Sequence, residues 1–187
     1  FGHTKQIGEN VLIIGVGNTA MDCCRTSLRL GAKNVKVMAR KPRGFFKASA
    51  WELEDAEEES VEMVVNHSPK AFVIEEGKLV GMRFDRIEYE VEGGRIVSER
   101  VIEELVLPCD DVILAIGQEN AFPWIERDLG IEFDKWDVPA VDPATFQSTR
   151  PEVFFGGDAA LGPKNIIWAV EQGHQAAISI HKHCMGL

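Results

Sequence analysis

The sequence has no excess of positive charge and no long apolar run. Its formal net charge at pH 7 is −10, which argues against nucleic acid and anionic membrane surfaces as partners, because both are bound by basic faces. No apolar run reaches the roughly 20 residues of a membrane-spanning helix, and no signal or transit peptide opens the chain. We therefore expect a cytoplasmic protein that binds neither nucleic acid nor membranes. Because the chain begins at Phe1 rather than Met, we also expect it to be a segment of a longer protein.

Cysteine is scarce, and its spacing excludes the common cysteine sites. The four cysteines are Cys23, Cys24, Cys109 and Cys184, and they contain no CxxC pair. A thioredoxin-like disulfide, a zinc ribbon and an iron–sulfur cluster all need a different spacing. The segment 181–184 reads HKHC, which is more typical of a helix end than of a metal site. We predict no bound metal, and thiols that stay reduced, as in the cytoplasm.

What the sequence does contain is a strand, a glycine-rich turn and a helix in immediate succession. Residues 11–21 read VLIIGVGNTAM, with Gly15 and Gly17 directly after the apolar run. Gly15 allows a sharp turn, and Gly17 has no Cβ to keep a pyrophosphate away from the backbone. The helix that follows presents free N–H groups and the positive end of its dipole to phosphates. With a second strand at 35–39, this order predicts a dinucleotide-binding site rather than a purely structural turn.

The end of that second strand carries cations where many such sites carry an acid. An Asp or Glu about 20 residues after the glycines usually accepts a hydrogen bond from the ribose 2′-hydroxyl of NADH. Here Arg40, Lys41 and Arg43 follow the strand, and no carboxylate is present. A guanidinium binds a 2′-phosphate with paired hydrogen bonds, whereas an acid repels it. The pattern favours NADPH over NADH, the alternative being an ordinary solvated basic loop.

Hydrophobic periodicity indicates an α/β protein whose pattern changes in its middle. Helices are expected at 19–30, 51–60 and 165–184, and buried parallel strands at 11–14, 35–39, 61–66 and 111–116. The six acidic residues within 52–59 are expected to form a solvated helix face. Antiparallel strands are expected at 71–75, 78–91 and 95–107. The dipeptides Glu76-Gly77 and Gly93-Gly94 separate them, as in hairpins.

These elements predict a Rossmann-like three-layer dinucleotide-binding domain that contains an antiparallel β-meander. We place this domain at 1–122, since Pro123 and Trp124 open a new segment at 123–187. Short strands are expected there at 131–133, 138–141 and 153–155. The last of them runs into Gly156-Gly157-Asp158. Paired glycines let a cofactor pass close to the backbone, and an Asp at a strand end can accept from sugar hydroxyls, although a GGD alone is usually a turn.

Taken together, these segments resemble the NADPH-oxidoreductase subunit of bacterial glutamate synthase. Related proteins include the matching parts of dihydropyrimidine dehydrogenase and of ferredoxin-NADP transhydrogenases. The resemblance runs in order over nearly the whole chain. It is carried by GVGNTAMD at 15–22, ARKPR at 39–43, ELEDAEEE at 52–59, AIGQ at 115–118 and VFFGGDAALGPKNIIWAVEQG at 153–173.

The resemblance implies a flavoprotein in which an NADPH domain is inserted between two halves of an FAD domain. Residues 123–187 would then be the C-terminal part of the FAD domain. The implied NADPH contacts are Gly15, Gly17, Asn18 and Thr19 at the pyrophosphate, Arg40, Lys41 and Arg43 at the 2′-phosphate, and Gly117 and Gln118 on the nicotinamide side. The implied FAD contacts are Asp158 at the ribityl chain, and Asn165, Ile166 and Ile167 near the flavin ring; Gly157 is expected to bind the same cofactor.

The sequence also departs from that family. The separate GxGxxG for the FAD pyrophosphate and the cysteines for iron–sulfur clusters are absent, and Phe46-Lys47-Ala48 replaces the frequent Met-Pro-Ala. The implied function is hydride transfer from NADPH to FAD, followed by electron transfer to a partner. That partner would be a glutamate synthase large subunit or a ferredoxin-like protein or domain. No catalytic acid, base or nucleophile is then needed, and none is indicated by motif spacing. The alternative is a non-catalytic module that binds pyridine nucleotides and regulates a partner.

Overall fold

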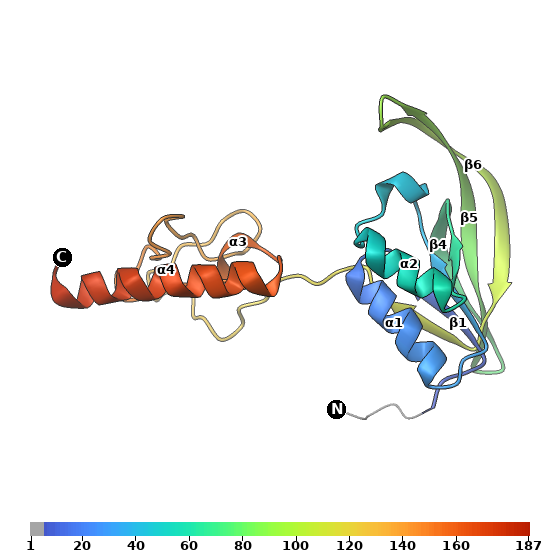
Figure 1. The fold of residues 1–187 in the computed structure, drawn as a ribbon, viewed down its shortest axis with the longest axis horizontal. Helices are drawn as coiled ribbons and strands as arrows, with labels where there is room; N and C mark the ends of the chain where they lie inside the picture. The colour runs from blue at the N-terminus through green and yellow to red at the C-terminus, as the bar shows by residue number, and fades with distance from the viewer. Residues whose placement is uncertain (1–5) are drawn as a thin grey trace. The chain divides into compact units, whose positions relative to one another are not determined.

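The computed structural model describes residues 6–187, which divide into two compact units (Figure 1). The first unit ends at Gly117, and the second runs from Gln118 to Leu187. The division falls a few residues before the boundary expected at 122/123. None of the helices among the described residues is long and apolar enough to cross a membrane.

A parallel sheet forms the centre of the first unit, as the apolar runs predicted. Its four strands lie in the order β3-β2-β1-β7 and are all parallel. They are β1 (Asn10–Ile14), β2 (Asn34–Met38), β3 (Glu62–Val64) and β7 (Asp111–Leu114). Strand β1 is buried on both faces, since Leu12 and Ile13 are 2% and 0% exposed. A strand of this kind needs a packed layer on each side.

Two helices cover one face of this sheet. They are α1 (Asn18–Arg29) and α2 (Ala50–Glu58), separated by the short 3-10 helix η1 (Arg43–Phe45). Met21 and Cys24 of α1 pack against Val11 and Ile13 of β1. The predicted helices at 19–30 and 51–60 are therefore confirmed to within a few residues.

The antiparallel β-meander covers the other face. It consists of β4 (His67–Glu75), β5 (Lys78–Glu92) and β6 (Arg95–Pro108). Its buried Met82 and Phe84 pack against Leu12, Ile14 and Met38 of the parallel sheet. Both turns are of the tight type in which the two central residues have positive φ, with values of 48° and 77° at Glu76-Gly77 and 55° and 76° at Gly93-Gly94. The three-layer arrangement predicted from the sequence is confirmed (Figure 1).

The second unit is built around a small aromatic core and one long helix. Helix α3 (Asp158–Leu161) is short, and α4 (Ile166–Met185) begins at Asn165, whose side chain accepts from the backbone N–H of Trp168 at 3.0 Å. The strands expected at 131–133, 138–141 and 153–155 are wrong as strands. Those segments form only isolated bridges, such as Phe133 with Pro139 and Gln147 with Phe154. Each segment is too short to form a ladder without a longer neighbouring strand.

Candidate functional site

A cleft of about 680 Å³ opens at the carboxyl ends of the parallel strands in the first unit. It is lined by the segment from Ile14 to Gly17, by Thr19 and Met38, by Arg40, Lys41, Phe45 and Lys47, by Ser68 and Pro69, and by the segment from Ala115 to Gly117. In open α/β sheets, ligands bind outside this end of the strands. The glycine turn and the basic loop are thus two walls of one cleft, as the sequence predicted.

The two glycines of the turn have different surroundings. A Cβ on Gly15 would lie 2.2 Å from the carbonyl oxygen of Ala115, and Gly15 has a φ of +131°. Gly15 is therefore needed by the fold, because the chain passes close to the segment after β7. A Cβ on Gly17 would meet nothing within 4 Å, and Gly17 has an ordinary negative φ. Since the protein itself does not require glycine there, the open space in front of Gly17 fits close approach of a ligand.

Helix α1 begins beside that open space. Gly17 is its N-cap residue and supplies no side-chain cap. The first N–H groups of a helix have no intrahelical partner, and they carry the positive end of the dipole. Thr19 lines the cleft at this point. The Oδ1 of Asn18 instead accepts a hydrogen bond from the backbone N–H of Ser49 at 3.0 Å, so that side chain ties the turn to the loop before α2.

The cations that line the cleft differ from the predicted set in one residue, because Lys47 takes the place of Arg43. Arg40 and Lys41 line the cleft, together with Lys47. Arg43 does not line it, because its guanidinium makes two contacts of 2.5 and 2.6 Å with the carboxylate of Glu57 on α2. That hydrogen bond lowers the pKa of Glu57. The described residues that line the cleft therefore carry three cations and no carboxylate, in a chain of net charge −10.

Hydrogen bonds fix the loop that carries these cations. The carbonyl of Val16, in the glycine turn, accepts from the backbone N–H groups of Lys47 and Ala48 at 3.1 and 2.9 Å. At the other end of the loop, the hydroxyl of Tyr89 on β5 donates to the carbonyl of Arg40 at 2.9 Å. Sequence reasoning missed Lys47 and Tyr89. The Lys at position 47, where the family often has Pro, could have pointed to an additional cation in the cleft. No feature of the local sequence pointed to Tyr89.

The remaining predicted residue of the first unit, Gly117, lines the cleft and has a φ of +115°. Gln118 is exposed and begins the second unit. Cys23 and Cys24 of α1 are free, and burial raises the pKa of the Cys24 thiol to about 11. At neutral pH that thiol is protonated and is a poor nucleophile.

In the second unit, the predicted FAD residues gather around the start of α4. Gly157 has a φ of +66° and donates its backbone N–H to the side chain of the buried Gln172 at 2.8 Å. The carboxylate of Asp158 accepts from the backbone N–H of Lys164 at 3.3 Å. Ile166 and Ile167, in the first turn of α4, are 82% and 79% exposed. The buried Gln172 holds the backbone of Gly157 beneath this region, and sequence reasoning missed it.

Solved structures with the same fold include a thioredoxin reductase and an NADPH complex of the protein FprA. Thioredoxin reductase of T. acidophilum matches with a TM-score of 0.76 and 21% identity, over 96% of this chain and 54% of that one. FprA of Mycobacterium tuberculosis, solved in complex with NADPH, matches with a TM-score of 0.71 and 15% identity, over 96% and 53%. At these identities the likeness establishes the α/β dinucleotide-binding fold alone.

Sequence relatives are closer and agree with the resemblance seen in the motifs. The beta subunit of an NADP(+)-dependent formate dehydrogenase from Moorella thermoacetica is 39% identical over 94% of this chain and 25% of its own length. The small chain of glutamate synthase [NADPH] is 36% identical in Halomonas elongata and 35% in Azospirillum brasilense. Those matches cover 92% and 97% of this chain, and 38% of each small chain. The chain thus spans well under half the length of these relatives.

The family profile described as pyridine nucleotide-disulphide oxidoreductase matches residues 2–173. The match includes the glycine turn, the basic loop and the start of α4. From this match, the fold and the relatives, we conclude that the chain belongs to the pyridine nucleotide-disulphide oxidoreductase family.

Proposed function

We propose that the first unit binds NADPH, as part of a flavoprotein oxidoreductase that passes a hydride from NADPH to FAD and then electrons to a partner subunit or domain. The observation that carries the nucleotide assignment is the lining of the cleft. A helix N-terminus and an open glycine position lie at one wall, and three cations without a carboxylate lie at the other. The relatives named as NADPH or NADP(+) enzymes support the same choice of cofactor.

The two walls suit different parts of the nucleotide. The pyrophosphate would lie against Gly17 and the first N–H groups of α1, near Thr19, since that position combines free donors with the positive helix end. The 2′-phosphate would lie at Arg40, with Lys41 and Lys47 nearby, since an arginine can form paired charge-assisted hydrogen bonds with it. Asn18 would act indirectly in this arrangement, by holding the loop before α2.

The second unit carries residues that fit part of an FAD site. The exposed carboxylate of Asp158 is suited to accept hydrogen bonds from ribityl hydroxyls. The N–H groups of Ile166 and Ile167, at the start of a 20-residue helix, are suited to an electron-rich carbonyl oxygen of the flavin ring. Bound FAD would supply the change from two-electron hydride chemistry to onward electron transfer. The partner is proposed as a subunit or domain, because several relatives are named as subunits.

Calorimetric titration of the 187-residue chain with NADPH and NADH tests the cofactor assignment. We expect NADPH to bind more tightly by about 1–3 kcal/mol, or roughly 5- to 150-fold, from the hydrogen bonds to its 2′-phosphate. Arg40→Ala should weaken NADPH binding and leave NADH binding nearly unchanged. Arg43→Ala is the matched control, because Arg43 is engaged with Glu57, and it should retain most of the preference. The preference should also shrink with added salt.

Equal affinities in the wild type, or a preference for NADH, would contradict the assignment. The alternative of a non-catalytic regulatory module is tested separately. Full-length protein supplied with NADPH and a dye acceptor should reduce the dye if hydride transfer takes place. Nucleotide binding without dye reduction would favour the regulatory module.

A further inference from the structure

We propose that Tyr89, in the β-meander, is a positioning residue that sets the preference of the cleft for a 2′-phosphorylated nucleotide by holding the backbone of Arg40. This inference rests on the proposed binding of NADPH and extends it to a residue outside the cleft. Tyr89 is the only tyrosine of the chain. Its hydroxyl donates to the Arg40 carbonyl at 2.9 Å, across 49 positions of sequence.

The strands of the meander place Tyr89 beside the carbonyl of Arg40. Strand β4 pairs with β5 only as far as Arg86, and beyond it β5 continues with β6 alone to the turn at Gly93-Gly94. The register of β5 with β6 shifts between Arg86 and Ile87, where this two-stranded extension begins. A shift of this kind marks a bulge, which bends a hairpin and increases its twist.

Contacts at the base of the extension anchor it to the parallel sheet. Ile87 is 8% exposed, and its backbone N–H donates to the carbonyl of Asn66 at 2.8 Å. The next residue of the chain, His67, donates its backbone N–H to the carbonyl of Ala39 at 2.9 Å. Ala39 directly precedes Arg40. Alternation along β5 places Tyr89 on the same face as the buried Ile87, and its hydroxyl reaches the residue that follows Ala39 at the end of β2.

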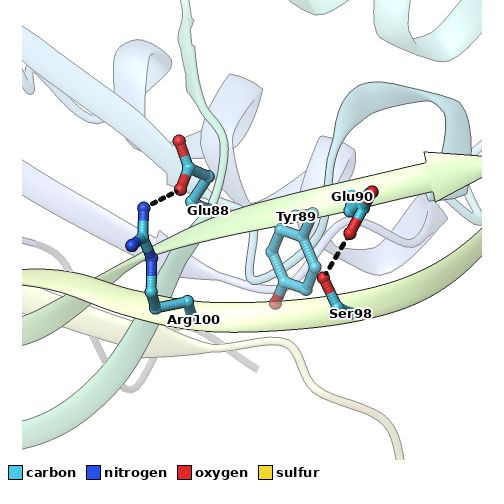
Figure 2. Close-up of a pocket in the computed structure, with 5 residues that line it drawn as sticks. All are labelled: Glu88, Tyr89, Glu90, Ser98 and Arg100. Carbon is cyan, nitrogen blue, oxygen red and sulfur yellow. Dashed lines mark hydrogen bonds and ion pairs between the residues drawn. The ribbon is translucent and has the colours of Figure 1, made fainter.

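Two exposed polar pairs lie on either side of Tyr89 in the extension. Arg100 forms an ion pair with Glu88, and the hydroxyl of Ser98 donates to Glu90 at 2.9 Å (Figure 2). Partial burial raises the pKa of Tyr89, so the phenol keeps its proton and acts as a donor at neutral pH. The hydrogen bond from Tyr89 fixes the carbonyl of Arg40, so the backbone from which the Arg40 side chain extends is held in place. A guanidinium held in this way loses less freedom when it binds a phosphate.

The test compares Tyr89→Phe with wild type in titrations with NADPH and NADH. Removal of one hydroxyl should weaken NADPH binding by about two- to tenfold, which matches the net worth of a single hydrogen bond. NADH binding should change by less than about twofold, since NADH has no 2′-phosphate for Arg40 to hold. Ser98→Ala is the matched control, because it removes a hydrogen bond from the same extension without touching Arg40. It should leave both affinities unchanged.

A double-mutant cycle with Arg40→Ala separates a positioning role from a general one. If Tyr89 acts through Arg40, Tyr89→Phe should cause no further loss of NADPH affinity once the guanidinium is absent. Equal weakening of both nucleotides by Tyr89→Phe, additive losses in the cycle, or an unchanged NADPH affinity would overturn the inference while leaving the proposed function in place. A wild-type chain that does not prefer NADPH would refute the proposed function itself, and the inference with it.

Discussion

At the scale of single residues, Gly15 and Gly17 of the glycine turn are under different constraints. A side chain at Gly15 would collide with the Ala115 carbonyl, and the φ of +131° is unsuited to other residues. Gly17 has neither constraint. The fold therefore requires glycine at position 15 but not at position 17, where the open space leaves room for a ligand.

This difference predicts opposite effects of two matched substitutions. Gly15→Ala should destabilise the fold by about 2 kcal/mol or more, because it adds both a clash and a strained backbone. Gly17→Ala should change the free energy of unfolding by less than about 1 kcal/mol, since the cap and entropy effects are small and opposed. It should nevertheless weaken NADPH binding by about tenfold or more, as a Cβ would stand where the pyrophosphate approaches. Chemical denaturation and calorimetry measure the two quantities. A Gly17→Ala variant with unaltered affinity would show that the pyrophosphate lies elsewhere.

Local patterns were sufficient to predict much of the cleft, and they failed where a distant residue decides the outcome. The cleft brings together Gly15, Gly17, Thr19, Arg40, Lys41 and Gly117 from the predicted set. Arg43 was predicted to line the cleft but does not, because its guanidinium binds Glu57, 14 positions further along the chain. The contact between Tyr89 and Arg40 spans two layers of the fold, and no spacing rule signals such a pair.

At the scale of elements, the acidic helix α2 is more than a solvated face. Asp55 and Glu59 bind Arg25 of α1 at 3.0 and 2.8 Å, and Glu59 also binds Arg29 at 2.8 Å. The run of acids within 52–59 was expected to face water. The role of these acids was only partly predictable. Their partners, Arg25 and Arg29, lie one turn apart on α1, about 30 positions earlier in the sequence.

These contacts predict a specific loss of stability in acid. Arg29 and Arg25 hold the pKa of Glu59 at about 2, below its ordinary value of 4.5. The stabilisation by Glu59 is therefore fully present above pH about 4.5, and it is lost as the pH falls toward 2. Glu59→Gln should lower the melting temperature at pH 6 and reduce the difference between pH 6 and pH 3. Glu58→Gln, at the exposed neighbouring position, should follow the wild type. Parallel curves for Glu59→Gln and wild type would show that the ion pairs contribute nothing measurable.

The two turns of the meander and the bounds of β5 and β6 were predicted to within a residue, because Glu76-Gly77 and Gly93-Gly94 supply the backbone freedom that tight turns need. Strand β4 begins at His67, earlier than the predicted start at 71. The helix start at Asn165 was equally clear, since its side chain caps α4. Residues 153–155 were less predictable. An apolar run favours a strand, but a ladder also requires a partner of sufficient length, and that requirement is not local.

At the scale of the whole molecule, the two units differ in the motifs that they carry. The first unit carries a glycine fingerprint and a cleft at the ends of its strands. The second carries Asp158 and the start of α4, without a glycine fingerprint of its own. The matched relatives are two and a half to four times longer than this chain, to judge by the 25% to 38% of their lengths that are covered.

We predict that the 187-residue chain alone does not retain FAD. The proposed FAD contacts of the second unit are limited to the ribityl chain and the ring, and its sequence has no GxGxxG, the motif that usually binds the pyrophosphate of a dinucleotide. The purified chain should be colourless and should release no stoichiometric flavin on denaturation, as absorbance at visible wavelengths will show. A yellow preparation with one flavin per chain would contradict the prediction.

The pairing of β1 with β7 has a consequence for how the chain is made. Val11 lies beside Asp111 in the sheet, and the backbone N–H of Asn10 binds the Asp110 carboxylate 100 positions away. During synthesis at about 5–20 residues per second, β1 waits roughly 5–20 s for this neighbour to leave the ribosome. Meanwhile the apolar edge of β1 can pair with the wrong strand. The contacts within the α1–α2 layer and within the meander are nearer in sequence, so we expect β7 to join the central sheet last, since closing a long loop is slow.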